Sequence, residues 1–108
     1  MLLIQSIDQD LVTSLRERQH EKTGVLRMLK TSLKNFAIAQ RMPESKITDE
    51  QVIATLRQEV KKRKEAIEAF VGGGRPELAD KERRELSILE NYLPPMMPAD
   101  EIKAIIEA

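Results

Sequence analysis

Apolar residues recur along the chain at intervals of three and four positions, the spacing that places them on one face of an α-helix. The pattern starts at Ile4 and Ile7 and returns after each polar or proline-containing break. The resulting segments predict helices over residues 5–18, 22–41, 49–71, 76–93 and 99–107. The longest of them follows Thr48 and Gln51, which have the form of a capping box, and is ended by three glycines.

The composition also favours an all-α fold. Aromatic residues make up 3 % of the 108 positions and charged residues 33 %, with only 4 glycines. Sandwiches and barrels need aromatic and β-branched strands joined by frequent glycine turns, so this profile argues against them. We predict a small bundle of four helices followed by a short fifth helix.

The fifth predicted helix is separated from the others by the proline-rich stretch 94–98. We therefore assign residues 1–93 to the bundle, and residues 94–108 to a linker and the first helix of a second subdomain that is truncated here or naturally short. The apolar face of this helix has no evident local partner. Three isoleucines on it are candidates for docking on a partner or on a second copy of the chain: Ile102, Ile105 and Ile106.

Charge is distributed unevenly, although 18 basic and 18 acidic residues give a formal net charge of zero. Between Lys22 and Met42 there are 5 basic residues and no acidic one. On a helix, four of them fall within an arc of about 60°: Arg27, Lys30, Lys34 and Arg41. This face is long enough to follow several phosphates of an RNA backbone, and the alternative is an ordinary solvated polar face.

Arg63 falls within the apolar arc of its predicted helix, and Glu82 and Glu85 fall within the apolar arc of the next one. The short glycine-rich connection makes these two helices antiparallel neighbours. We therefore predict a partly buried ion pair between Arg63 and Glu82 or Glu85. The alternatives are that the two carboxylates belong to a ligand site, or that the helix phase differs.

Patterns for catalysis are weak. The chain contains no cysteine and a single histidine, His20, which excludes cysteine-dependent chemistry and metal sites with two histidines. The glycine run lacks the lysine and hydroxyl residue of a phosphate-binding loop. We predict no catalytic residue, no metal site and no cofactor. Because no stretch approaches 18 apolar residues and no secretory signal is visible, we expect a cytoplasmic protein without a membrane partner.

A series of short motifs runs through nearly the whole chain. They are Arg27-Met28-Leu29-Lys30 with Leu33-Lys34-Asn35, Glu59-Val60-Lys61-Lys62-Arg63-Lys64, Gly74-Arg75-Pro76-Glu77-Leu78 and Tyr92-Leu93-Pro94. In this order the chain resembles the YqeY-like family, small bacterial proteins similar to the tail domain of the GatB subunit of tRNA-dependent amidotransferase. Members of that family usually continue past the last motif into a second small helical subdomain.

The resemblance implies an all-helical fold and a link to tRNA, because the GatB tail engages tRNA. Our first hypothesis is a non-catalytic accessory module that binds tRNA, or a tRNA-amidotransferase-type complex, through the basic residues of the second predicted helix. The alternative is a protein-interaction module that docks through residues 99–107. A third hypothesis is carbon–nitrogen ligase activity of the chain itself with glutamine as the amide donor, for which the matched motifs contain no catalytic residue.

Overall fold

The computed structural model describes residues 2–94. Within this range the chain forms α1 (Leu3–Arg16), α2 (His20–Ala39), the 3₁₀ turn η1 (Glu44–Lys46), α3 (Asp49–Gly72) and α4 (Pro76–Glu90), and it contains no strand. The predicted all-α class with four helices is confirmed. None of these helices is long and apolar enough to cross a lipid bilayer. The predicted fifth helix and its residues Ile102, Ile105 and Ile106 lie outside the described residues.

The start of α3 follows the sequence closely. Thr48 accepts a hydrogen bond from the backbone N–H of Gln51 at 3.2 Å, and the Gln51 side chain accepts one from the backbone N–H of Thr48 at 3.0 Å. This reciprocal pair is the capping box that the sequence indicates. The helix ends at the glycines, where Gly74 adopts a φ of 73° that reverses the chain toward α4.

The first two helices each begin and end two residues earlier than the apolar pattern predicts. The earlier ends are explained by Arg18 and Arg41, which adopt left-handed backbone angles with φ of 59° and 55°. Such angles are incompatible with a continuing right-handed helix. Because arginine carries no turn preference of the kind that glycine has, the sequence gives no signal for either ending.

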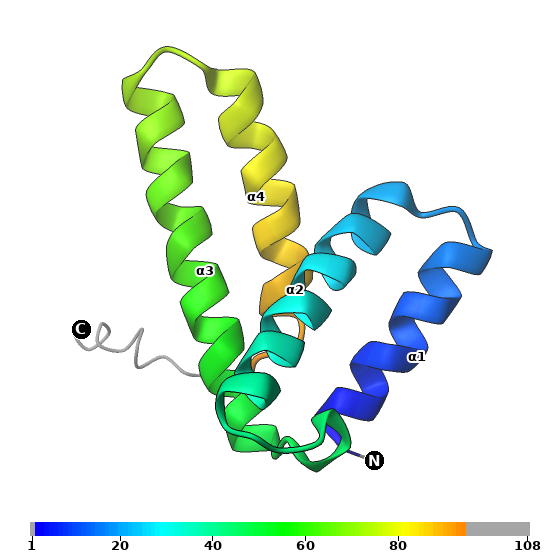
Figure 1. The fold of residues 1–108 in the computed structure, drawn as a ribbon. Helices are drawn as coiled ribbons and strands as arrows, with labels where there is room; N and C mark the ends of the chain where they lie inside the picture. The colour runs from blue at the N-terminus through cyan, green and yellow to red at the C-terminus, as the bar shows by residue number, and fades with distance from the viewer. Residues whose placement is uncertain (1, 95–108) are drawn as a thin grey trace.

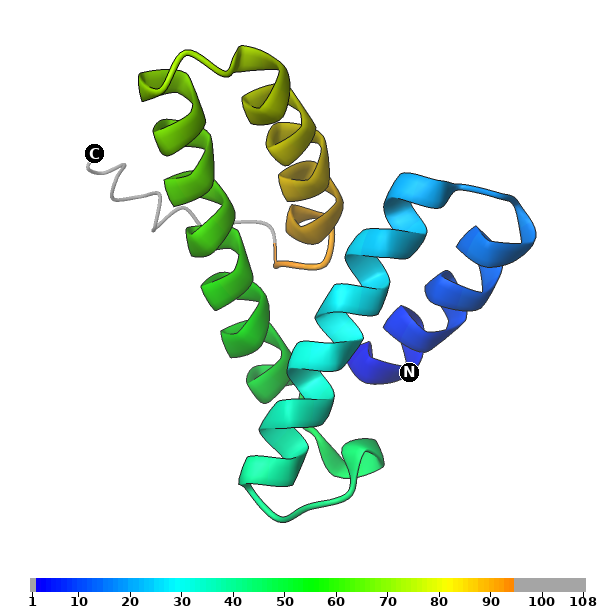
Figure 2. The same cartoon turned by 45° about the horizontal axis from the view of Figure 1, so that its top comes forward.

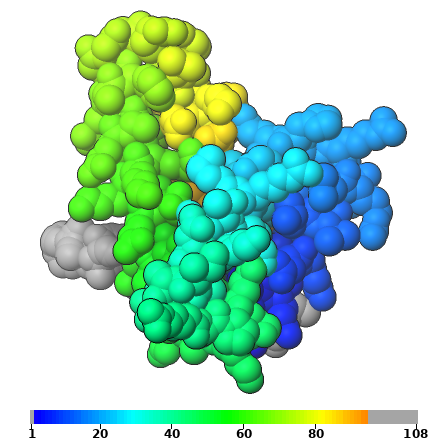
Figure 3. All heavy atoms as spheres, in the orientation of Figure 1, coloured from blue at the N-terminus to red at the C-terminus, as the bar shows by residue number. Residues whose placement is uncertain are grey.

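The helices form two hairpins, α1 with α2 and α3 with α4 (Figure 1). The hairpins meet at the end where η1 connects them and diverge toward their turns, as the rotated view also shows (Figure 2). Helix α2 packs against all of the other helices, and the space-filling view shows it between α1 and α3 (Figure 3). Its position makes α2 the element on which the candidate sites are built.

One hydrophobic core joins the two hairpins at their shared end. Its largest fully buried apolar side chains come from every helix and from the segment after η1: Ile7, Val25, Leu26, Leu29, Leu33, Ile47, Val52, Leu56 and Leu89. Because three of the leucines lie on α2 at intervals of three and four residues, one face of α2 is committed to this core. The remaining faces of α2 are free to carry polar chemistry.

Candidate functional site

The solvent-facing side of α2 carries Arg27 and Lys34, two helical turns apart. Both side chains are exposed, and neither forms an ion pair with any residue of 2–94. Arg41 is exposed as well, but it lies beyond the end of α2 in its left-handed conformation. The outer face of α2 therefore presents two uncompensated positive charges, with a third just past its end.

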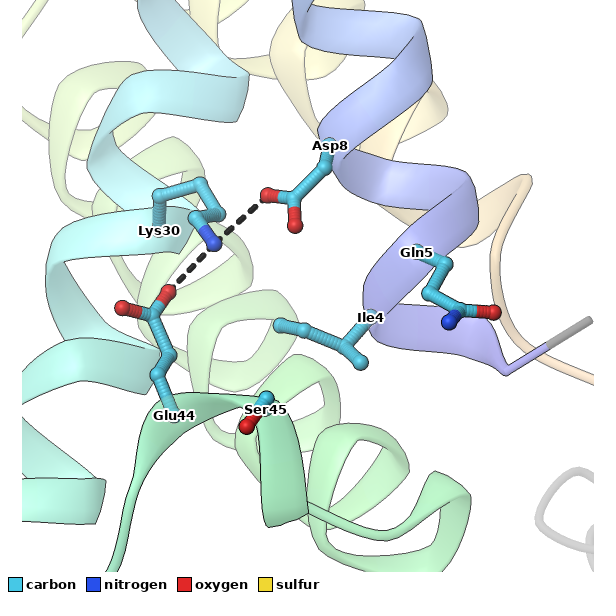
Figure 4. Close-up of a pocket in the computed structure, with 6 residues that line it drawn as sticks. All are labelled: Ile4, Gln5, Asp8, Lys30, Glu44 and Ser45. Atoms are coloured by element: carbon cyan, nitrogen blue, oxygen red, sulfur yellow. Dashed lines mark ion pairs between the residues drawn. The ribbon is translucent and has the colours of Figure 1, made fainter.

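Lys30, the fourth cation of this set, is placed differently. Its Nζ lies 2.6 Å from Asp8 Oδ1 of α1 and also pairs with Glu44 Oε2 of η1. Figure 4 shows the two carboxylates approaching the ammonium group from α1 and from η1, in a cavity of about 240 Å³. Lys30 thus ties three elements together, and its charge is already compensated within the fold.

The electrostatic surroundings of Lys30 act in two directions. Burial by itself lowers the pKa of the ammonium group, because it penalises the charged form. The hydrogen bonds and charges of Asp8 and Glu44 outweigh this effect and raise the pKa above the ordinary value of 10.5. Lys30 is therefore a fixed, fully charged structural group at neutral pH.

Arg63 lies in the seam between α3 and α4. Its Nη1 is 2.7 Å from Glu82 Oε1 and 2.6 Å from Glu85 Oε1, and its side chain is only 8 % exposed. The second oxygen of Glu85 pairs with Lys81 Nζ at 2.9 Å. The structure thus brings together the three residues that the sequence places in this seam, and Arg63 and Lys81 pair with both oxygens of Glu85 and with one oxygen of Glu82.

The Arg63 cluster also reaches the other hairpin. Nη2 of Arg63 donates a hydrogen bond to Met28 Sδ of α2 at 3.3 Å, which links the α3–α4 seam to the α1–α2 hairpin. A sulfur acceptor is weak, so this contact adds packing more than bond strength. The contact shows that the face of α2 carrying Met28 lies toward the seam between α3 and α4.

A second polar feature, which the apolar pattern did not predict, is a groove between α2 and α3 of about 340 Å³. Helix α2 contributes Ser32, Asn35 and Phe36 to its lining. Helix α3 contributes four polar side chains at intervals of three and four residues: Thr55, Gln58, Glu59 and Lys62. We call this feature the α2–α3 groove.

The carboxylate of Glu59 is the central charge of the α2–α3 groove. Glu59 is 8 % exposed, and its Oε2 accepts a hydrogen bond from Ser32 Oγ at 3.0 Å. The ammonium group of Lys62 lies 3.6 Å from the same oxygen. Within the α2–α3 groove, the Glu59 carboxylate is thus met by one hydroxyl and one ammonium group of the protein itself.

A histidine-based site and a metal site both lack support in the described part of the chain. His20 is the first residue of α2 and its side chain is exposed. No group of three or more carboxylate or imidazole side chains within residues 2–94 is arranged to hold a metal ion.

The fold and the exposed cations of α2 define a class of protein: a small all-helical domain built on a cationic central helix. The chain belongs to the family of YqeY-like proteins, whose pattern it matches over residues 4–108. It is also 34 % identical over 88 residues to an uncharacterized protein of the fission yeast Schizosaccharomyces pombe, an alignment that covers 82 % of this chain and 69 % of the yeast protein. Relatives are thus not confined to bacteria, and family membership supports a domain of the GatB-tail type.

Proposed function

We propose that this chain is a non-catalytic RNA-binding module that holds tRNA by its phosphate backbone, alone or within a tRNA-amidotransferase-type complex. The contact surface is the outer face of α2. Family membership supports the proposal, because the GatB tail to which the family is similar engages tRNA. The link to tRNA rests on that similarity, whereas the residues involved are argued from this structure.

The observation that carries the proposal is the contrast among the cations of α2. Arg27 and Lys34 are exposed and have no acidic partner in the described part of the molecule, and the segment from Lys22 to Met42 contains no acidic residue. Uncompensated cations on one face attract phosphates and release their counterions on binding. Lys30 contributes little, because Asp8 and Glu44 already neutralise it.

The proposal is tested by reversing the two free charges, in the double variant Arg27→Glu with Lys34→Glu. Binding of unmodified tRNA is measured by fluorescence anisotropy at several salt concentrations. We expect affinity to fall steeply with salt in the wild type, and the double variant to reduce the slope of log affinity against log salt by about 2, one unit for each phosphate that the protein no longer neutralises.

The matched control is Lys61→Glu with Lys64→Glu, which changes the net charge equally at two exposed positions of α3. It should retain most of the affinity, because these cations lie on another helix. Equal losses in the two double variants, or tRNA binding that does not respond to salt, would show that the outer face of α2 is not the binding surface.

A further inference from the structure

The guanidinium group of Arg63 has one edge that the fold leaves poorly satisfied. Nη1 donates to Glu82 and Glu85, and Nη2 donates to Met28 Sδ at 3.3 Å. The third nitrogen, Nε, is buried and has no hydrogen-bond partner within residues 2–94. In the planar guanidinium, Nε–H points out of the same edge as one N–H of Nη2. The acceptor placed at this edge is therefore a thioether sulfur, which accepts hydrogen bonds only weakly.

Met28 combines its contact with Arg63 with access to solvent. Residues 2–94 contain two methionines, Met28 and Met42. Met28 is 47 % exposed, whereas Met42 is partly buried and packs against the hydrophobic core. Because a thioether is oxidised to a sulfoxide by peroxides, and exposure governs which sulfur is reached, Met28 is the methionine of this region that an oxidant meets first.

We propose that Met28 is a redox-sensitive modification site, at which hydrogen peroxide converts the thioether to a sulfoxide that Arg63 then binds. Peroxide transfers one oxygen atom to Sδ: the O–O bond breaks, and a lone pair of the sulfur forms the S–O bond. The proton of the transferred oxygen leaves with the departing hydroxide as water. The sulfur is oxidised, the peroxide is reduced, and the step does not depend on RNA binding.

The sulfoxide oxygen supplies the acceptor that this edge of Arg63 lacks. A sulfoxide is polar, and its oxygen is a far better acceptor than the sulfur it replaces. The methionine side chain has three rotatable bonds, so the oxygen turns toward the guanidinium, where Nε–H and Nη2–H both point at it. Hydrogen bonds from a charged donor are about twice as strong as neutral ones. Oxidation of Met28 thus replaces a weak contact with two charge-assisted hydrogen bonds and satisfies the buried Nε–H.

The contact between Met28 and Arg63 joins the two hairpins of the fold. Met28 lies on α2, and Arg63 lies on α3 in the seam with α4. A stronger bond between the two residues holds the α1–α2 hairpin more firmly against the α3–α4 hairpin. Oxidation of a methionine normally disrupts the packing around it. The proposal requires the opposite sign at Met28, a gain in stability, and reduction of the sulfoxide by methionine sulfoxide reductases makes that gain reversible.

The test compares the full wild-type chain with Met28→Leu, which keeps a similar side-chain volume but has no sulfur at this position. Both proteins are treated with hydrogen peroxide, mass spectrometry locates the added oxygen, and thermal unfolding is followed by circular dichroism. We expect peroxide to change the melting temperature of the wild type by about 4–8 °C upward relative to its effect on Met28→Leu, the shift that one net hydrogen bond gives in a domain of this size. Because the other methionines are present in both proteins, this difference reports Met28.

Met28→Gln serves as the second variant, because it carries an oxygen on its δ atom, as the sulfoxide does, without any oxidant. We expect untreated Met28→Gln to melt at a higher temperature than untreated Met28→Leu. The proposal is wrong if Met28 stays unmodified while Met42 is oxidised, or if peroxide lowers the melting temperatures of the wild type and Met28→Leu equally. It is also wrong if Met28→Gln melts no higher than Met28→Leu, because an acceptor at this position then does nothing for Arg63.

Discussion

Two cations of this fold each lie between two carboxylates, yet their surroundings differ. Arg63 is 8 % exposed and contacts Glu82 and Glu85, which both belong to α4. Lys30 is 22 % exposed and contacts Asp8 of α1 and Glu44 of η1, and the Asp8 side chain is itself 50 % exposed. The Arg63 cluster also contains Lys81, which pairs with Glu85, and the two clusters differ in their access to water.

Access to water decides how much each cluster contributes to the free energy of unfolding. In the Arg63 cluster the carboxylates are shielded, so removal of the guanidinium leaves like charges that water cannot solvate. In the Lys30 cluster the carboxylates can return to solvent when the ammonium is removed, so little free energy depends on the pair. Two cations that each bridge a pair of carboxylates thus have different consequences for stability, and substitutions at Lys30 and Arg63 measure that difference directly.

The largest effect is expected from Arg63→Met. The change leaves Glu82 and Glu85 facing each other in the seam, and we expect the free energy of unfolding to fall by about 3–5 kcal/mol. Urea denaturation followed by circular dichroism measures the loss. The triple variant that adds Glu82→Gln and Glu85→Gln should recover most of it, since no buried charge then remains. A loss below about 1 kcal/mol for Arg63→Met would show that the seam is solvated.

The next effect separates the two carboxylates of the Arg63 cluster. Glu85 is 10 % exposed and accepts from both Arg63 and Lys81, whereas Glu82 is 18 % exposed and accepts from Arg63 alone. We therefore expect Glu85→Gln to cost about 2 kcal/mol, and Glu82→Gln to cost less. The same denaturation measurements rank the two variants. The reverse order would mean that the Lys81 contact contributes nothing.

The partners of Arg63 could be predicted from the sequence, whereas the partners of Lys30 could not. Arg63 and its carboxylates lie on two consecutive helices joined by a short turn, so helical phase alone brings them together. The partners of Lys30 come from α1 and from η1, and no periodic pattern relates those segments to α2. Helical spacing shows only that Lys30 has no acidic neighbour between Lys22 and Met42, and it carries no information on partners from other elements.

The α2–α3 groove escaped prediction for a related reason. The apolar pattern identifies which face of each helix is buried, but the pairing of the remaining faces depends on how the hairpins are packed. One signal was present: Glu59 precedes Val60 within the apolar stripe of α3, where a charged residue is unusual. Its partner Ser32 lies 27 residues earlier on another helix, and only the fold brings the two together.

A smaller effect is expected when the Lys30 cluster is broken. Lys30→Met should lower the free energy of unfolding by about 1 kcal/mol or less, because Asp8 and Glu44 regain water. The loss should nearly vanish in 1 M salt, which screens partly exposed pairs, whereas the Arg63→Met loss should persist. Lys34→Met is the matched control on the same helix and should change stability by less than about 0.5 kcal/mol. A salt-resistant Lys30 effect would place that cluster in the same class as the Arg63 cluster.

The smallest and most specific effect is the pH dependence of the free energy that Lys30 contributes to the stability of the fold. Because the folded state raises the pKa of Lys30 above 10.5, its contribution is fully present below that pH and is lost as the pH rises through the folded-state pKa. The phenol of Tyr92 adds a loss in the same range, since burial and its 2.5 Å hydrogen bond to Asp10 raise its pKa above 10.0. The wild type alone therefore cannot separate the two groups.

The difference in unfolding free energy between the wild type and Lys30→Met removes the Tyr92 contribution, which both proteins share. Measured by urea denaturation from about pH 8 upward, this difference should shrink toward zero in strongly alkaline solution. A Lys30 difference that stays flat over this range would mean that Asp8 and Glu44 do not stabilise the charged ammonium, and that the cavity between α1, α2 and η1 is held by packing alone.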